Sequence, residues 1–192
     1  MTSEDRLNIL FICTANQCRS PLALVLAKEQ LRQRGVNATI SSAGYLSGGV
    51  EAAEGSQKAA KKRGLDLSDH VSQRLDADMI NGADVVIGME PGHILDLVDE
   101  VAGSQAWALT LKELASYARA QKAAAWTTPL TTEEIRSWVR SAGARDLQSL
   151  LTRDTTINDP MGRSNRAFRA TAKEIDELLT EVFDAWFGPV KS

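Results

Sequence analysis

Short apolar runs alternate along the first half of the chain with longer segments in which apolar residues recur every three or four positions. The runs have the length and composition of strands, and they cover about 7–12, 38–42, 84–88 and 105–109. The segments between them have the period of helices, and they cover about 20–34, 52–63, 76–81 and 91–101. This alternation predicts a three-layer α/β/α fold in which helices cover both faces of a four-stranded parallel sheet.

The segment at about 103–156 is predicted to be an extended helical region. Two or three helices fit its sequence, with a break near Pro129 and an N-cap at Thr131 or Thr132 before two glutamates. Three tryptophans fall in this region, and we expect them to pack in the core or against a lid: Trp107, Trp126 and Trp138.

The C-terminal segment at about 165–187 is predicted to be a strongly amphipathic helix. Its apolar face is formed by residues at three- and four-residue steps: Phe168, Ala172, Ile175, Leu179, Val182 and Trp186. We expect this face to pack on the sheet and to fix the preceding loop, which carries Asp159.

Composition and charge narrow the class of protein. With 192 residues, 43% of them hydrophobic and 24% charged, the chain suits one domain over 1–192 with a sizeable core. Its net charge of −3 disfavours nucleic acid or an anionic membrane as the main partner. No apolar run is long enough to span a bilayer, and the acidic start at 1–5 is unlike a signal peptide, so we expect a cytoplasmic protein.

The cysteines and histidines limit disulfide, metal and cofactor chemistry. Cys13 and Cys18 are the two cysteines and share one loop, which disfavours a structural disulfide framework. The two histidines, His70 and His93, form no cluster with zinc-ligand spacing, and we expect His93 to be a solvated residue in the first turn of a helix. No dinucleotide-binding or Walker motif occurs, so the sequence predicts neither a metal nor a cofactor.

The octet from Cys13 to Ser20 lies between the first predicted strand and helix, and it carries the candidate chemistry. Such a loop can curl around a phosphate-sized anion, because its N–H groups and the helix N-terminus supply positive potential. The Arg19 guanidinium can donate two hydrogen bonds to an oxyanion. The same surroundings favour the thiolate form of Cys13, which would then face a bound phosphate as a nucleophile.

The residues around the octet support this location. Ser20 is a good N-cap and Pro21 suits the first helical position, while Gly35 can end the helix. The Ser20 hydroxyl can also donate toward the Cys13 sulfur. Asn16 suits a tight loop because asparagine tolerates a positive φ.

These residues resemble the low-molecular-weight protein tyrosine phosphatase family, whose nucleophile loop reads Cys-x-Gly-Asn-x-Cys-Arg-Ser. Further segments resemble the family downstream: Ser41–Gly44, Arg63–Ser72, Ala83–Met89 and the late Asp-Pro loop at Asp159–Gly162. The segment before that loop is longer than in typical members. The resemblance implies a flavodoxin-like, phosphotyrosine phosphatase I-like fold and a phosphoric monoester hydrolase that needs no cofactor.

Carried over by position, the resemblance implies Cys13 as the nucleophile, Arg19 as the transition-state clamp and Asp159 as the general acid and then base. It implies that His70 bonds to the loop asparagine and supports it from behind. The expected substrate-binding residues are the remaining loop residues and two nearby side chains: Thr14, Ala15, Asn16, Gln17, Cys18, Ser20, Tyr45 and Met161.

Departures from the family pattern concern the substrate. Ala15 stands where the family usually has glycine, so we expect an ordinary backbone there. Gln17 replaces the apolar residue of many tyrosine-specific members and leaves a phosphoarginine substrate open. Met161 replaces the aromatic residue that often follows Asp-Pro, and Tyr45 is an alternative wall of the pocket.

Several functions therefore stay open beside the main one, a phosphatase acting on phosphotyrosine in proteins. They are a protein-arginine phosphatase, an arsenate reductase of the same fold, which would need further cysteines, and a non-catalytic module that binds phosphate or other tetrahedral oxyanions. Cys18 either packs as a small apolar residue or forms a reversible disulfide with oxidised Cys13. The resemblance is compatible with a monomer or a weak dimer.

Overall fold

The computed structural model describes residues 6–121, 129–145 and 148–190. Its sheet has four parallel strands in the order β2-β1-β3-β4, namely β1 (Leu7–Cys13), β2 (Ala38–Gly44), β3 (Val85–Gly88) and β4 (Ala108–Thr110). The predicted parallel sheet is confirmed. Because β1 has β2 on one side and β3 on the other, the strand order reverses at β1. In open α/β sheets, ligands bind beyond the carboxyl ends of the strands at this point.

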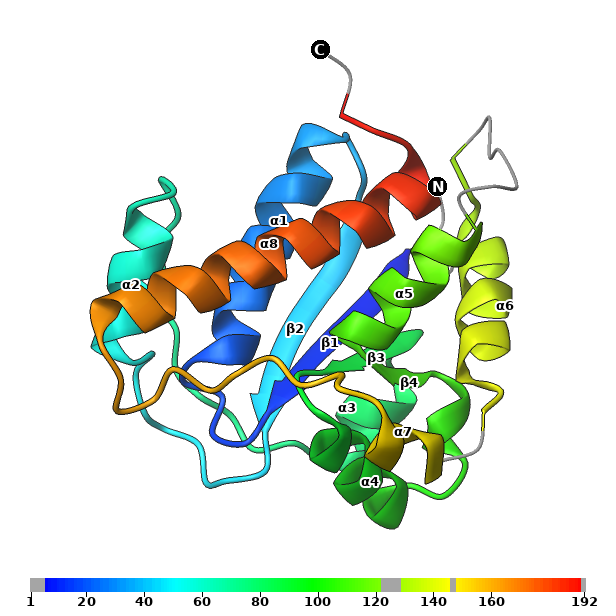
Figure 1. Cartoon of the computed structure of the whole chain (residues 1–192), viewed down its shortest axis with the longest axis horizontal. Helices are drawn as coiled ribbons and strands as arrows, with labels where there is room; N and C mark the ends of the chain where they lie inside the picture. The colour runs from blue at the N-terminus through cyan, green and yellow to red at the C-terminus, as the bar shows by residue number, and fades with distance from the viewer. Residues whose placement is uncertain (1–5, 122–128, 146–147, 191–192) are drawn as a thin grey trace.

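Helices cover both faces of the sheet, as Figure 1 shows for α8, α1 and α5 on the near face. They are α1 (Arg19–Gln33), α2 (Glu54–Lys61), α3 (Ala77–Asn81), α4 (Pro91–Glu100), α5 (Leu111–Gln121), α6 (Thr132–Gly143), α7 (Gln148–Thr152) and α8 (Asn165–Phe187). Within β1, Ile9 and Phe11 pack with α1, α5 and α8, whereas Leu10 and Ile12 pack with α3 and α4. This alternation produces the three predicted layers.

The fourth strand is shorter and later than predicted. A 3₁₀ turn (Ser104–Ala106) occupies the start of the predicted run, after Gly103 with a φ of +89°. Trp107 closes this turn with a backbone bond to Ser104, and its indole N–H donates to the Ile80 carbonyl. The strand therefore begins only at Ala108, since an apolar run alone does not distinguish a strand from a buried turn.

The helical region before the last helix follows the prediction. Thr131 and Glu134 form a reciprocal capping box at the start of α6. The Trp138 ring of α6 makes edge contacts with Tyr117 of α5 and with Trp186 of α8, so it packs in the core. Trp126 lies outside the described residues. All six apolar residues predicted for α8 are buried.

No helix in the described part of the chain has the length and apolar character needed to cross a membrane.

Candidate active site

The loop from Cys13 to Ser20, hereafter the Cys13 loop, joins the carboxyl end of β1 to α1. Asn16 organises it, with the positive φ of 54° that the sequence predicts. Its side-chain amide donates to the hydroxyls of Ser20 and Ser42, both at 2.9 Å, and its side-chain oxygen accepts from the Gln73 N–H at 3.0 Å. Since Asn16 is fully buried, these bonds fix the curvature of the loop.

Two expectations about the loop backbone are confirmed. Among the described residues Asn16 is the one non-glycine with a positive φ, so Ala15 has an ordinary backbone. The His70 ring lies behind the loop, with Nε2 at 2.8 Å from the Asn16 carbonyl oxygen. Because Asn16 is thus bonded through both its side chain and its carbonyl, the loop geometry is set from outside the loop.

The start of α1 differs from the prediction. The helix begins at Arg19, and Cys18 is its N-cap residue without a side-chain capping bond, so Ser20 is not the cap and Pro21 is not the first helical residue. The Ser20 hydroxyl instead lies 3.0 Å from the Cys13 sulfur. Since this hydroxyl already accepts from Asn16, its proton is free to donate to a Cys13 thiolate. The predicted Ser20–Cys13 contact is present although the predicted cap is not.

Gly44 at the end of β2 supports the loop from the side. A Cβ atom at this position would lie 2.7 to 2.9 Å from backbone atoms of Asn16, Thr14 and Cys13, so only glycine allows this approach. The next residue, Tyr45, donates its N–H to the Thr14 carbonyl at 2.8 Å. The strand next to β1 therefore positions the loop as well as completing the sheet.

Arg19 is buried, with a 2% exposed side chain, and its guanidinium joins three parts of the chain. On one edge, Nη1 donates to Glu90 Oε2 at 2.6 Å and to the Ile157 carbonyl at 3.1 Å. Nη2 donates to Asp159 Oδ2 at 3.1 Å. Nε is buried and has no hydrogen-bond partner among the described residues, so one strong donor is unsatisfied.

Asp159 lies against Arg19 although 139 residues separate them in the chain. One carboxylate oxygen accepts from Arg19, and the other accepts from the Met161 N–H at 3.0 Å, which orients the side chain. Its side chain is 46% exposed, so it remains accessible from the mouth of the site. The three residues predicted to be catalytic are thus arranged around one loop.

Sequence reasoning missed Glu90 as a functional candidate. It follows β3 at the same sheet edge as Cys13, and its carboxylate holds the inner edge of the Arg19 guanidinium. Its place directly after a buried apolar strand was a usable signal, because side chains after parallel strands converge at this edge.

The expectation for His93 was wrong. The residue is in the first turn of α4, but its side chain is buried and not solvated. Its Nδ1 accepts from the Met89 N–H at 3.2 Å, and its Nε2 lies 3.1 Å from Thr14 Oγ1 and 3.4 Å from a Glu90 oxygen. Burial is the main reason that the pKa of His93 is lowered to about 4, so the imidazole is neutral at neutral pH.

Cys18 has different surroundings from Cys13. Burial, followed by the negative charge of Asp159, raises the pKa of the Cys18 thiol to about 12. The residue therefore stays a thiol at neutral pH and packs in the core with α1 and α8. This accounts for Cys18 as a small apolar residue, while its reversible disulfide with Cys13 stays a prediction.

The side chains predicted to contact substrate differ in exposure. Tyr45 stacks on His93, with ring centroids 6.0 Å apart, and donates its hydroxyl to the His93 carbonyl, so its ring lies beside the Cys13 loop. Met161 is exposed next to Asp159. Gln17 is half-buried, and its carbonyl accepts from the Ala53 N–H before α2.

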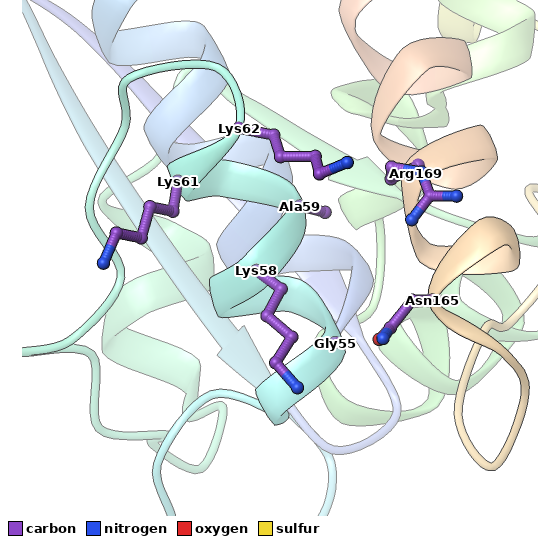
Figure 2. Close-up of a pocket in the computed structure, with 7 residues that line it drawn as sticks. All are labelled: Gly55, Lys58, Ala59, Lys61, Lys62, Asn165 and Arg169. Carbon is purple, nitrogen blue, oxygen red and sulfur yellow. The ribbon is translucent and has the colours of Figure 1, made fainter.

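A groove lies elsewhere, between α2 and α8 (Figure 2). It has a volume of about 300 Å³, and it is lined by Gly55, Lys58, Ala59, Lys61, Lys62, Asn165 and Arg169. In Figure 2, Lys62 extends across it toward α8, the helix that carries Arg169. The lining of the groove contains no cysteine, hydroxyl or carboxylate side chain, so the candidate phosphate chemistry belongs to the Cys13 loop. Within the described residues, no three histidine, cysteine or acidic side chains form a group that could hold a metal ion.

Comparison with known proteins points to phosphate chemistry, as the geometry of the Cys13 loop does. The family model described as low molecular weight phosphotyrosine protein phosphatase matches residues 8–134. The probable low molecular weight protein-tyrosine-phosphatase AmsI of Erwinia amylovora is 42% identical over 92 residues, which are 47% of this chain and 60% of that protein. The chain thus matches less than two thirds of the length of this relative.

Two further relatives extend the comparison. A protein-arginine-phosphatase of Bacillus subtilis is 32% identical over 108 residues, which are 56% of this chain and 71% of that protein. The crystal structure of a low molecular weight protein tyrosine phosphatase from T. tengcongensis has a TM-score of 0.71 at 23% identity, over 93% of this chain and 98% of that chain. The chain belongs to the low molecular weight phosphotyrosine protein phosphatase family.

Proposed function

We propose that this protein is a cysteine-dependent phosphatase that hydrolyses phosphorylated protein side chains, most readily phosphotyrosine, through a phosphocysteine intermediate. The observation that carries the proposal is the Arg19 guanidinium between the Cys13 loop and Asp159, with a buried Nε that has no acceptor among the described residues. A phosphoryl oxygen is the kind of acceptor that this donor needs. The nucleophile, clamp and acid then face one bound group.

In the first step, the Cys13 thiolate attacks phosphorus and the bond from phosphorus to the leaving-group oxygen breaks. Asp159, in its protonated form, gives its proton to that oxygen, so the alcohol or phenol leaves neutral. Charge on the three phosphoryl oxygens is stabilised by Arg19 and by the N–H groups of the first turn of α1, which have no partner within the helix. The product of this step is a phosphocysteine on Cys13.

In the second step, the Asp159 carboxylate removes a proton from a water molecule, whose oxygen attacks phosphorus. The bond from sulfur to phosphorus breaks, and inorganic phosphate and the Cys13 thiolate are released. The Ser20 hydroxyl, 3.0 Å from the sulfur, supports both steps because it stabilises the thiolate as nucleophile and as leaving group.

Glu90 has a supporting function in this scheme. Together with the Ile157 carbonyl it occupies the Nη1 edge of Arg19, and Nη2 bonds to Asp159, so Nε is the donor that is left for phosphate. The carboxylate also lowers the cost of keeping a guanidinium buried before substrate arrives. A fixed guanidinium loses little freedom when it binds an oxyanion.

A protein-arginine phosphatase is the second candidate. It is favoured by Gln17, a polar residue in the loop where an apolar residue would suit a phenol ring, and by the arginine phosphatase among the relatives. The reaction steps are unchanged, except that Asp159 would protonate nitrogen. Comparison of kcat/KM for matched phosphotyrosine and phosphoarginine peptides decides between the two. We expect a higher value for phosphotyrosine, and the reverse order would favour the second candidate.

The test of the proposed function is hydrolysis of an aryl phosphate in the presence of a reductant and a metal chelator. We expect wild-type protein to release phosphate, the Cys13→Ser variant to release none, and Asp159→Asn to be slower by about 10²–10⁴-fold. Absence of activity in a folded wild-type protein would contradict the proposal. Equal activity of wild type and Cys13→Ser would contradict the covalent mechanism.

A further inference from the structure

The proposed function leaves unexplained why His93 is buried against the mouth of the Cys13 loop. Three of its contacts involve the site: the Met89 N–H at Nδ1, and Thr14 Oγ1 and Glu90 Oε1 near Nε2. Tyr45 covers the ring by stacking and by its bond to the His93 carbonyl. A side chain held from so many directions has a single orientation.

The contact with Met89 determines the tautomer of this imidazole. A backbone N–H is always a donor, so Nδ1, at 3.2 Å from the Met89 nitrogen, must carry a lone pair and no proton. In the neutral ring the proton is then on Nε2. Nε2 therefore donates to Thr14 Oγ1 at 3.1 Å, and Thr14 is the acceptor in this bond.

The direction of that bond determines where the Thr14 hydroxyl proton can point. The second lone pair of Thr14 Oγ1 faces Arg19 Nη2, which lies 3.5 Å away. Both acceptor positions of the oxygen are therefore directed at donors, and its own O–H must point to a third direction. Thr14 is exposed, whereas His93 and Arg19 are buried, so this third direction is the mouth of the loop.

We propose that His93 is a positioning residue, which turns the Thr14 hydroxyl into a fixed donor to a non-bridging phosphoryl oxygen of the substrate. This inference rests on the proposed function. Arg19 Nη2 contacts both Thr14 and Asp159, so the Thr14 donor lies on the same side of the loop as the general acid. A rigid neutral donor adds to the Arg19 clamp without adding charge to the site.

The experiment is a double-mutant cycle on the binding of inorganic phosphate, measured by titration calorimetry with the full chain. Thr14→Val removes the hydroxyl at constant shape, and Thr14→Ser keeps it. His93→Phe keeps the ring that stacks on Tyr45 but removes both nitrogens, and His93→Gln restores a donor near Nε2.

We expect Thr14→Val to weaken phosphate binding by about tenfold, and Thr14→Ser to stay within about twofold of wild type. His93→Phe should weaken binding severalfold in the wild-type background and have no further effect in the Thr14→Val background. His93→Gln should recover part of the loss. Melting temperatures of all variants identify any that fail to fold, and the Thr14 pair tests the donor even if His93→Phe does not fold.

The inference is overturned if Thr14→Val binds phosphate as wild type does, or if His93→Phe costs the same in both Thr14 backgrounds, because a purely structural histidine predicts additive effects. The proposed function fails separately, if wild-type protein binds phosphate with this coupling but does not hydrolyse an aryl phosphate. A folded wild type that binds no phosphate would overturn the inference, and one that also hydrolyses no aryl phosphate would overturn the proposed function as well.

Discussion

At the scale of single residues, the site depends on buried polar groups whose partners are specified. Asn16 is the clearest case, because its amide, its side-chain oxygen and its carbonyl are all bonded to residues of other elements or of the loop. Arg19 is the contrasting case, since one buried donor has no partner in the described residues. Satisfied groups hold the loop, and the unsatisfied donor marks the place that we propose for the anion.

We predict that Asn16→Ala lowers the free energy of unfolding by about 2–4 kcal/mol, because it leaves buried partners without bonds and puts alanine at a φ of 54°. Asn16→Gly is the matched control, since glycine tolerates this φ but also lacks the amide. It should be less destabilised than Asn16→Ala, yet equally impaired in phosphate binding. Chemical denaturation measures the first difference, and equal stability of the two variants would contradict the strained backbone.

The buried neutral His93 predicts a pH dependence of stability. Its pKa is about 4 in the folded protein and 6.5 in the unfolded chain, so between these values the unfolded state binds more protons. Stability therefore falls as pH drops through this window, by up to about 3 kcal/mol from this group. Glu90 and Asp159 favour the charged imidazole and Arg19 opposes it, but burial dominates.

Denaturation of wild type and His93→Phe between pH 7 and 4 isolates this contribution. The free energy of unfolding should fall more for the wild type than for the variant as pH decreases. At the middle of the window, the slope of this difference against pH should correspond to the uptake of about one proton. Parallel pH profiles would show that His93 takes up its proton equally in both states.

At the scale of elements, the sequence pattern was most informative where apolar residues form a continuous run or a single helix face. The six apolar positions of α8 and the apolar run of β1 could be predicted from the sequence, and the structure buries the α8 positions and nearly all of β1. Two features could not be predicted from the sequence. The start of β4 depends on the turn after Gly103. The burial of His93 depends on its contacts with Thr14, Met89 and Tyr45. Cys13, Arg19 and Asp159 were identified from loop chemistry and family resemblance, whereas Glu90 needed the three-dimensional arrangement.

Support of the Cys13 loop by β2 gives a prediction at this scale. Gly44→Ala should displace the loop, because the new methyl group would lie within 2.9 Å of three backbone atoms, and we expect a loss of phosphate binding and a lower melting temperature. Gly92→Ala is the control: this glycine is in α4, has nothing within 4 Å of an added Cβ, and should be neutral or slightly stabilising. If Gly44→Ala binds phosphate as well as the control does, the Cys13 loop does not depend on its close contact with Gly44.

At the scale of the whole molecule, the site is assembled from segments that are distant in the chain. The Cys13 loop follows β1, Glu90 and His93 follow β3, and Asp159 precedes α8, while the helices α5 and α6 pack against α8 through aromatic side chains. The parallel sheet brings the first two segments to one edge, and α8 anchors the third. The proposed reaction therefore depends on the fold as a unit, and the phosphocysteine on Cys13 is its most specific predicted consequence.

The most direct test of the account is detection of the phosphocysteine. Protein mixed with an aryl phosphate is quenched rapidly in acid, digested, and analysed by mass spectrometry for a phosphoryl group on the peptide that contains Cys13. We expect this adduct in wild-type protein at early times, and no thiol-linked phosphate in Cys13→Ser. Turnover of the aryl phosphate without any adduct on Cys13, or with the phosphoryl group on another residue, would contradict the central claim.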